Sequence, residues 1–188
     1  METAACNAVL RGVEKRYPGF TLGPVDLTVP AGSIVGLVGE NGAGKTTLLK
    51  LLTGINPADA GEITLLGGAP GDLASRADLG VVFEDAYFYE SMTAKQIGKS
   101  LAGIFGGRWD GEAYRGLLAR FGLDAAKTVK TYSRGMRMKL SLATALAHHP
   151  KLLVLDEATA GLDPVVRGEM LDLFLDFIQD ESRSILIS

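Results

Sequence analysis

A glycine-rich segment that ends in lysine and two threonines, residues 39–47 (GENGAGKTT), has the residue types and spacing of an anion site. It matches the phosphate-binding pattern G-x-x-x-x-G-K-[ST] at every constrained position. Glycines allow the backbone to turn its N–H groups inward around an anion. Lys45 is expected to reach the β- and γ-phosphates of a nucleotide, and the Thr46 hydroxyl to bind a magnesium ion. The candidate nucleotide-binding residues are Gly39, Glu40, Asn41, Gly42, Ala43, Gly44, Lys45, Thr46 and Thr47.

The segments on either side of this loop distinguish it from a glycine-rich turn that lies beside a lysine by chance. An apolar run, residues 33–38, precedes the loop, and a helix-like run, residues 48–52, follows it. A strand–loop–helix context is what a phosphate-binding loop requires. The N-terminal N–H groups and the positive dipole end of the helix would then point at the phosphates.

A second chemical feature is an apolar run that ends in two acidic residues, residues 152–157 (LLVLDE). A buried parallel strand reads as a continuous apolar run, and α/β sheets bind ligands at the carboxyl ends of their strands. Asp156 is suited to hold magnesium there, and Glu157 to polarise a water for attack on a γ-phosphate. Alone, such a strand is often structural, but beside a phosphate-binding loop it indicates a hydrolytic site.

Strand-like and helix-like segments alternate around these two features, which predicts an α/β fold with a P-loop NTPase core and a mostly parallel sheet. The region up to about residue 68 is rich in short β runs and predicts an N-terminal antiparallel β region. From residue 93 to about 127 the apolar spacing is helical. We therefore expect a discontinuous core, residues 1–85 and 135–188, interrupted by a helical subdomain, residues 86–134. Strands are expected at residues 25–29, 33–38, 62–66, 79–83, 151–155 and 184–187.

Composition narrows the class of protein. A chain of 188 residues suits one domain with a sizeable core. The net charge of −3 predicts no nucleic-acid partner. Cys6 is the only cysteine, which excludes an internal disulfide and favours a reducing compartment. His148 and His149 lack metal-ligand spacing and are expected in the last turn of a helix. No apolar stretch approaches the roughly 18 residues that a membrane span needs, and no signal-peptide pattern is seen.

Together with these two motifs, the segments 132–136 (YSRGM) and 160–163 (AGLD) resemble those of ABC transporter ATP-binding subunits. The resemblance runs from about Leu10 to Ser188. It implies ATP and Mg²⁺ as cofactors and a Mg-dependent ATPase activity. Asp163 resembles the aspartate that relays between the two nucleotide sites of this family.

Residues 132–136 stand where this family has its Leu-Ser-Gly-Gly-Gln signature. Ser133 and Gly135 match it, and the resemblance implies that they contact the γ-phosphate bound to the opposite subunit. Ser133 is also suited to cap the N-terminus of the helix that follows, and both roles can coexist. Three positions depart from the pattern. Arg134 places a cation where the family has glycine, which either helps to hold phosphate or crowds it. The other two departures are Tyr132 and Met136.

The resemblance extends to single positions with less specific signals. Tyr17, 28 residues before Lys45, resembles the aromatic residue that stacks on adenine, with core packing as the alternative. Glu84 occupies the place of a glutamine that joins magnesium and the attacking water. A glutamate keeps the oxygen ligand but adds a negative charge. Where the family receives a helix of its membrane partner, this chain has an aromatic-rich segment for which core packing is the alternative. Its candidate contacts are Tyr87, Phe88, Tyr89 and Met92.

The resemblance implies a subunit that closes on ATP as a head-to-tail sandwich dimer, with itself or with a related chain, and drives an integral membrane permease. It would then be cytoplasmic and peripheral on the inner face of the cell membrane. The single cassette and the aromatic-rich segment favour a bacterial exporter. A soluble ABC-type ATPase is one alternative, although the chain shows neither the coiled-coil insert nor the paired cassettes typical of that class. A nucleotide-gated binding module with negligible turnover is another. A GTPase is disfavoured because no Asn-Lys-x-Asp element is present.

The end of the chain carries one further expectation. In the family, the last strand is followed directly by a histidine that contacts the γ-phosphate, and residues 184–188 correspond to that strand. We expect the natural protein to continue past Ser188. We also expect residues 1–188 alone to bind ATP, to hydrolyse it weakly and to form no stable dimer.

Overall fold

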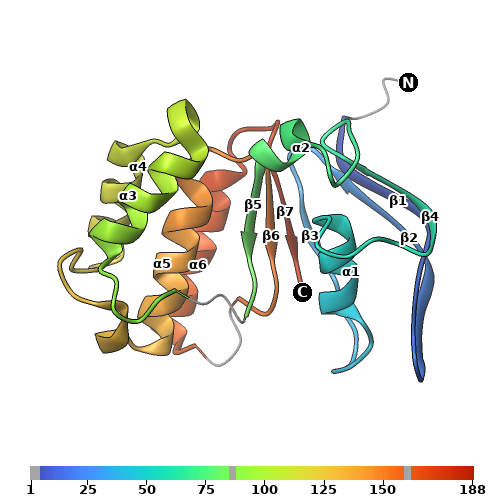
Figure 1. Cartoon of the computed structure of the whole chain (residues 1–188), viewed down its shortest axis with the longest axis horizontal. Helices are drawn as coiled ribbons and strands as arrows, with labels where there is room; N and C mark the ends of the chain where they lie inside the picture. Colours follow the sequence, from blue (N-terminus) through green and yellow to red (C-terminus); the bar gives the residue numbers. More distant parts are fainter. Residues whose placement is uncertain (1–4, 85–87, 159–161) are drawn as a thin grey trace.

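The computed structural model describes residues 5–84, 88–158 and 162–188, and its strands form two sheets (Figure 1). The first sheet is antiparallel, with strand order β2-β1-β4. The second is parallel, with strand order β3-β7-β6-β5. The predicted α/β fold with an N-terminal antiparallel region is therefore confirmed. The strands are β1 (Cys6–Tyr17), β2 (Phe20–Pro30), β3 (Ile34–Gly36), β4 (Ala60–Leu65), β5 (Leu79–Val82), β6 (Leu152–Leu155) and β7 (Ser184–Ile187).

Strand β6 lies in the middle of the molecule and is buried on both faces. Because side chains alternate along a strand, its two faces serve two different cores. Leu152 and Val154 pack with α1 (Lys45–Leu52) and the antiparallel sheet. Leu153 and Leu155 pack with the helices on the opposite face. The parallel sheet therefore lies between two apolar layers, with α1 on one side and α5 and α6 on the other (Figure 1).

The remaining helices gather mainly on the side of the parallel sheet away from the antiparallel one (Figure 1). The predicted insert, residues 86–134, contains α3 and α4, while its separation as a subdomain stays a prediction. The helices are α2 (Leu73–Ala77), α3 (Ala94–Phe105), α4 (Gly111–Arg120), α5 (Arg134–Leu146) and α6 (Pro164–Phe177), with 3₁₀ turns η1 (Gly106–Arg108) and η2 (Val129–Thr131).

Local chemistry explains how α3 and α4 pair. Thr93 and Gln96 form a capping box that starts α3, since each side chain bonds the backbone N–H of the other residue. The Tyr114 hydroxyl of α4 donates to the Ala94 carbonyl at 2.9 Å. A side chain at Gly98 would lie within 2.4 Å of the Tyr114 ring, so the close approach of the two helices requires glycine there.

Two local expectations differ from the structure. Strand β1 was not predicted, because register shifts between Leu10 and Val13 interrupt the two-residue alternation, with Gly12 at a positive φ of 56°. The two histidines follow α5 instead of lying in its last turn. His148 is buried, and its Nε2 lies 3.1 Å from the Leu79 carbonyl oxygen of β5. Burial lowers the pKa of His148.

Across the described ranges, the helices are all too short or too polar to cross a bilayer.

Candidate functional site

The glycine-rich loop lies between β3 and α1, as its pattern predicts. Gly44 precedes the first residue of α1 and has a φ of 97°, which glycine adopts without strain. A side chain at Gly44 would also lie 2.9 Å from the Phe20 ring and from Leu22. The backbone conformation therefore favours glycine strongly, and the N–H groups at the start of α1 are left accessible to an anion.

The Lys45 ammonium folds back over this loop. Its Nζ donates to the Gly39 carbonyl at 2.8 Å and to the Glu40 carbonyl at 3.1 Å. These bonds hold a positive charge above the inward-facing backbone. The combination of an ammonium and backbone N–H groups suits the phosphates of a nucleotide.

Thr46 and Asp156 meet although 110 positions separate them in the sequence. The Thr46 hydroxyl donates to Asp156 Oδ1 at 3.2 Å. Asp156 is 3% exposed, and its backbone N–H donates to the Val82 carbonyl at 2.9 Å, which places it beside the end of β5. A hydroxyl and a carboxylate are hard oxygen donors of the kind that magnesium uses together with phosphate oxygens. The two residues therefore fit the expected magnesium ion, although the described residues contain no cluster of three or more acidic, His or Cys side chains suited to a metal.

Glu157 shares a hollow with the phosphate-binding loop. Its backbone has a φ of 49°, which is unusual for a residue with a side chain and is a form of strain found often at functional sites. The hollow has a volume of about 290 Å³. Its lining residues are Phe20, Asn41, Gly42, Gly44, Lys45, Thr46, Thr47 and Glu157. The structure thus brings together the predicted phosphate ligands and the predicted general base.

Ser188 belongs to the same cluster and was missed in the sequence. Its hydroxyl donates to Asp156 Oδ1 at 2.8 Å and accepts from the Glu157 backbone N–H at 3.1 Å. The parallel pairing of β6 with β7, in register Leu155 to Ile187, carries it there. The signal that could have found Ser188 is its position just after an apolar strand, the same argument that identified Asp156.

The turn between β1 and β2 pairs Tyr17 with Phe20, but the two residues differ in their position relative to the hollow. Phe20 lines the hollow at the phosphate-binding loop, and it was missed in the sequence. Tyr17 is not among the lining residues of that hollow, and its hydroxyl accepts from Asn56 Nδ2 at 3.2 Å. Its ring is 39% exposed, with Lys15 Nζ 5.8 Å from the centroid. Stacking of Tyr17 on adenine stays a prediction.

The signature segment lines a second hollow, of about 330 Å³, at the start of α5. Ser133 caps this helix by accepting from the Met136 N–H at 3.2 Å. Among the described residues, the two hollows have no lining residue in common. The residues of the second hollow are Ser133, Arg134, Gly135, Met136, Lys139, Leu162, Asp163 and Val166.

Two neighbouring positions have structural roles that account for their residue types. The Tyr132 hydroxyl donates to the Asp124 carbonyl at 2.8 Å. The residue is buried, and this burial raises the pKa of Tyr132. Asp163 caps α6 by accepting from the N–H groups of Val165 and Val166 at 3.0 and 3.1 Å. The relay role of Asp163 stays a prediction, and residues 160 and 161 lie outside the described residues.

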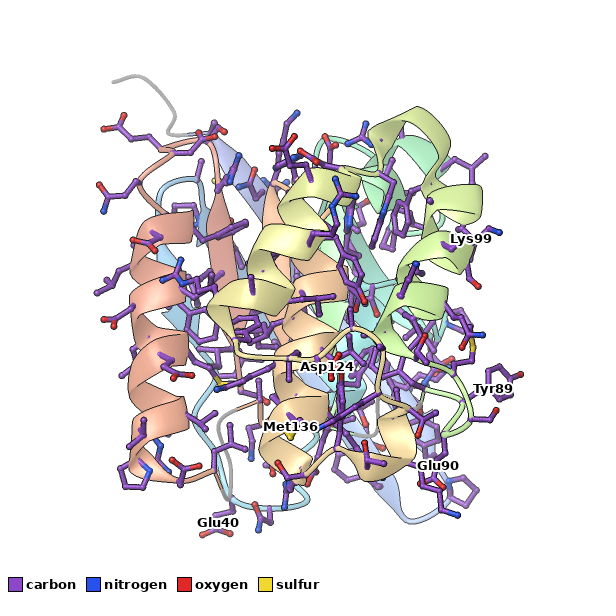
Figure 2. The ribbon with its side chains drawn as sticks, turned by 90° about the vertical axis from the view of Figure 1, so that its left-hand side faces the viewer. Glu40, Tyr89, Glu90, Lys99, Asp124 and Met136 are labelled. Atoms are coloured by element: carbon purple, nitrogen blue, oxygen red, sulfur yellow. The ribbon has the colours of Figure 1, made fainter. Side chains whose placement is uncertain are left out.

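The aromatic-rich segment is divided between core and surface. Phe88 and Met92 are partly buried against the helical core. Tyr89 is 79% exposed and points away from the ribbon (Figure 2). Tyr87 lies outside the described residues. Glu84 follows β5 and forms an ion pair with Arg134, with Oε1 and Nη2 3.0 Å apart. Its role as a magnesium ligand stays a prediction.

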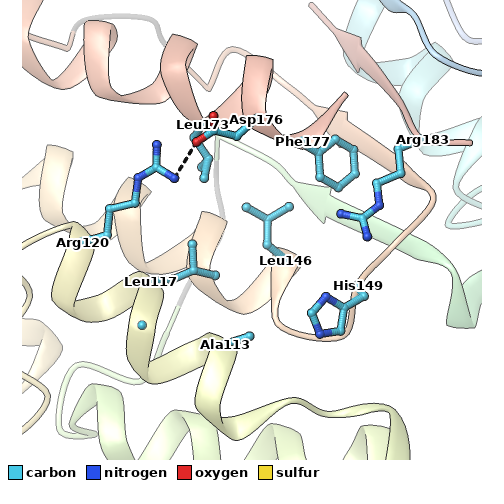
Figure 3. Close-up of a pocket in the computed structure, with 10 residues that line it drawn as sticks. Ala113, Leu117, Arg120, Leu146, His149, Leu173, Asp176, Phe177 and Arg183 are labelled. Atoms are coloured by element: carbon cyan, nitrogen blue, oxygen red, sulfur yellow. Dashed lines mark ion pairs between the residues drawn. The ribbon is translucent and has the colours of Figure 1, made fainter. Parts of the chain in front are cut away.

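A larger hollow, of about 400 Å³, lies among α4, α5 and α6 and contains none of the predicted site residues (Figure 3). Its charged side chains are paired with acids: Arg120 with Asp176 at 2.8 Å, and Arg183 with Asp180 at 3.1 Å. Size alone therefore does not mark the site, whereas the convergence of Lys45, the Thr46 hydroxyl and the Glu157 carboxylate at the smaller hollow does.

Comparisons with known proteins agree with this geometry. The profile of the ABC transporter family matches residues 22–160. The aliphatic sulfonates import ATP-binding protein SsuB of Escherichia coli is 36% identical over 196 aligned positions, which span all of this chain and 74% of SsuB. YbhF of Escherichia coli, named as a probable multidrug ABC transporter ATP-binding protein, is 37% identical over 86% of this chain and 29% of its own length.

A solved structure of an ATP-binding subunit of an ABC transporter superposes with a TM-score of 0.85 at 25% identity, over 96% of this chain and 78% of that chain. The chain spans between 29% and 59% of the length of several curated relatives. The profile match, the SsuB alignment and the loop–carboxylate geometry converge on one assignment: the chain belongs to the ABC transporter family, as an ATP-binding domain.

Proposed function

We propose that this domain binds Mg-ATP at the phosphate-binding loop and hydrolyses it. The observation that carries the proposal is the Thr46–Asp156 hydrogen bond of 3.2 Å, which joins the loop to the carboxylate at the end of β6. Glu157 and Lys45 line the hollow beside that bond. A phosphate ligand, a metal ligand and a base therefore line one cavity, and the second metal ligand, Asp156, bonds to Thr46 at its edge.

Each residue has a distinct task in this reaction. Lys45 exchanges its bonds with the Gly39 and Glu40 carbonyls for bonds with phosphate oxygens. Thr46 and Asp156 would hold Mg²⁺, which would supply positive charge beside the phosphate oxygens. Glu157 orients a water and accepts its proton as the water oxygen bonds the γ-phosphorus, while the bond from the γ-phosphorus to the bridging oxygen breaks and ADP leaves.

We further propose that two such domains close head to tail, as a homodimer or a heterodimer. The proposal is supported by the separation of the loop and the signature into two hollows that share no described lining residue. Ser133 and the Gly135 backbone of one subunit then contact the γ-phosphate held by the loop of its partner. Two-fold symmetry generates two identical composite sites from one pair of surfaces.

The driven partner is proposed to be an integral membrane permease, with this domain on the cytoplasmic face. Tyr89 offers an exposed aromatic side chain, beside the partly buried Phe88 and Met92. The relatives include one protein named for import and one named for multidrug transport, so export stays a prediction.

Calorimetry, phosphate release and sedimentation of the 188-residue chain test this proposal together. We expect ATP binding that is tighter with Mg²⁺ than with EDTA, because Thr46 and Asp156 can then act through the ion. Phosphate release that requires Mg²⁺ would support hydrolysis. Binding without any phosphate release, with or without a second cassette, would favour a nucleotide-gated module. No binding at millimolar ATP would overturn the proposal.

A further inference from the structure

Two departures from the family's pattern contact each other. Arg134 stands where the family has a signature glycine, and Glu84 stands where it has glutamine. The Arg134 Nη2 lies 3.0 Å from Glu84 Oε1. Glycine and glutamine at these positions could not form an ion pair, so the contact depends on both departures.

This ion pair is not needed to hold the two segments together. A second ion pair joins Arg137 to Glu90 at 3.2 Å. The backbone N–H of Lys130 donates to the Glu90 carbonyl at 3.0 Å, and that of Val129 donates to the Met92 carbonyl at 2.9 Å. The start of α5 and the segment after β5 therefore stay attached when Glu84 and Arg134 separate.

Both partners are open to water and can exchange for stronger ligands. The side chains of Arg134 and Glu84 are 59% and 47% exposed. Ion pairs at such positions are weak because water and salt screen them. The Glu84 carboxylate is attracted more strongly by a magnesium ion than by the guanidinium of Arg134. Arginine in turn binds phosphate oxygens with a planar pair of donors.

The positions of Glu84 and Arg134 indicate which ligand each residue would bind after the exchange. Glu84 follows β5, whose Val82 carbonyl bonds the backbone of the magnesium candidate Asp156. Glu84 is thus on the side of its own subunit's nucleotide. Arg134 lines the signature hollow, which serves the nucleotide of the opposite subunit under the proposed function.

We propose that the Glu84–Arg134 ion pair is a latch that couples the two nucleotide sites. Mg-ATP in a subunit's own site draws Glu84 toward the metal and releases Arg134 for the phosphate in the opposite site. Occupation of one site then favours binding at the other, which is positive cooperativity with a favourable coupling free energy. The inference rests on the proposed function, because it needs the sandwich arrangement of the two hollows.

A double-mutant cycle on nucleotide affinity tests the latch. ATP dissociation constants are measured by calorimetry, with Mg²⁺ and with EDTA, at a protein concentration where sedimentation shows monomers. Arg134→Gln removes the cation that competes for Glu84, so Mg-ATP binding should tighten about two- to fivefold, the scale of an exposed ion pair. The change should vanish in EDTA. It should also vanish in the Glu84→Gln background, because the competing carboxylate is already absent.

The neighbouring ion pair supplies a matched control. Arg137→Gln removes an equal charge from the next turn of α5, where its partner Glu90 is not a candidate metal ligand. Mg-ATP affinity should stay unchanged in that variant. An equal gain from Arg137→Gln would identify a general charge effect and overturn the latch.

Other outcomes separate the latch from the function on which it rests. If Arg134→Gln has the same effect with and without Glu84, or no effect, the latch is wrong while Mg-dependent ATP binding stands. If the parent chain binds ATP no better than its Lys45→Ala variant, the proposed function itself fails.

Discussion

The phosphate-binding half of the site and the signature half use their side chains differently. In the first, the side chains bond one another: Thr46 and Ser188 both donate to Asp156, and Lys45 bonds its own loop. In the second, Ser133 caps a helix and Arg134 pairs with Glu84. The bonds of the first half join the loop to the ends of two strands, whereas those of the second link the signature segment to its own helix and to Glu84.

This difference explains why the residue types are more constrained in the first half. The phosphate-binding loop favours glycine at Gly44 for its backbone conformation, whatever the ligand does. The signature hollow has no comparable internal requirement, so Tyr132 can turn its side chain into the core and still leave Ser133 at the helix start. Preorganisation of the first half is also what electrostatic catalysis requires.

The largest effect is expected at Glu157, the proposed general base in the phosphate-binding half of the site. Glu157→Gln keeps the size and one oxygen but cannot accept a proton. In the full-length protein, phosphate release should slow by about a hundredfold or more, the scale of a general base, while ATP still binds and closed dimers accumulate. Single-turnover phosphate release and sedimentation with ATP measure both consequences. Undiminished turnover would show that another group positions the water.

Lys45→Ala tests whether the loop at residues 39–47 binds the phosphates of ATP. Loss of a charged donor should weaken ATP binding by about 1.5–3 kcal/mol, roughly ten- to 150-fold, without loss of the fold. Calorimetry measures the affinity, and circular dichroism checks the fold. Lys50→Ala is the control, because Lys50 lies in the last turn of the same helix. Equal affinity in the parent and the Lys45 variant would contradict the assignment of the loop.

Replacement of Tyr17 tests whether its ring belongs to the nucleotide-binding half of the site. If its ring stacks on adenine, Tyr17→Ala should weaken ATP binding by roughly 1–2 kcal/mol. Tyr17→Phe keeps the ring and loses only the bond from Asn56, so its affinity should match that of the parent chain. No loss with Tyr17→Ala would assign the ring to packing, and Phe20→Ala would then test the aromatic residue that lines the hollow.

The smallest effect concerns the signature half, where Ser133 has both a capping and a proposed phosphate role. Ser133→Ala should lower the free energy of unfolding by about 1 kcal/mol through loss of the cap. Ser133→Asp restores the cap but places a negative charge at the phosphate contact, so stability should return while ATP-driven dimerisation of the full-length protein is lost. Urea titration and sedimentation separate the two roles. Normal dimerisation of the aspartate variant would place the phosphate contact elsewhere.

Sequence reasoning was sufficient where the chemistry depends on neighbouring residues along the chain. The loop at residues 39–47 forms between a strand and a helix as predicted, because its glycines and the start of α1 act over one short segment. Asp156 and Glu157 follow a strand whose apolar run is continuous, and that strand is buried on both faces as expected. Strand β1 escaped prediction because its register shifts interrupt the local alternation.

Contacts between distant segments were decided only by the tertiary structure. The register of β6 against β7 brings Ser188 to Asp156, and the pairing of β1 with β2 sets Phe20, not Tyr17, at the hollow. The bond between Glu84 and Arg134 joins residues 50 positions apart. Local residue patterns determine a loop or a strand because glycine conformations and apolar runs act over a few consecutive residues. Such patterns do not determine which strand ends and helix starts meet, since that depends on how both apolar cores pack around the parallel sheet.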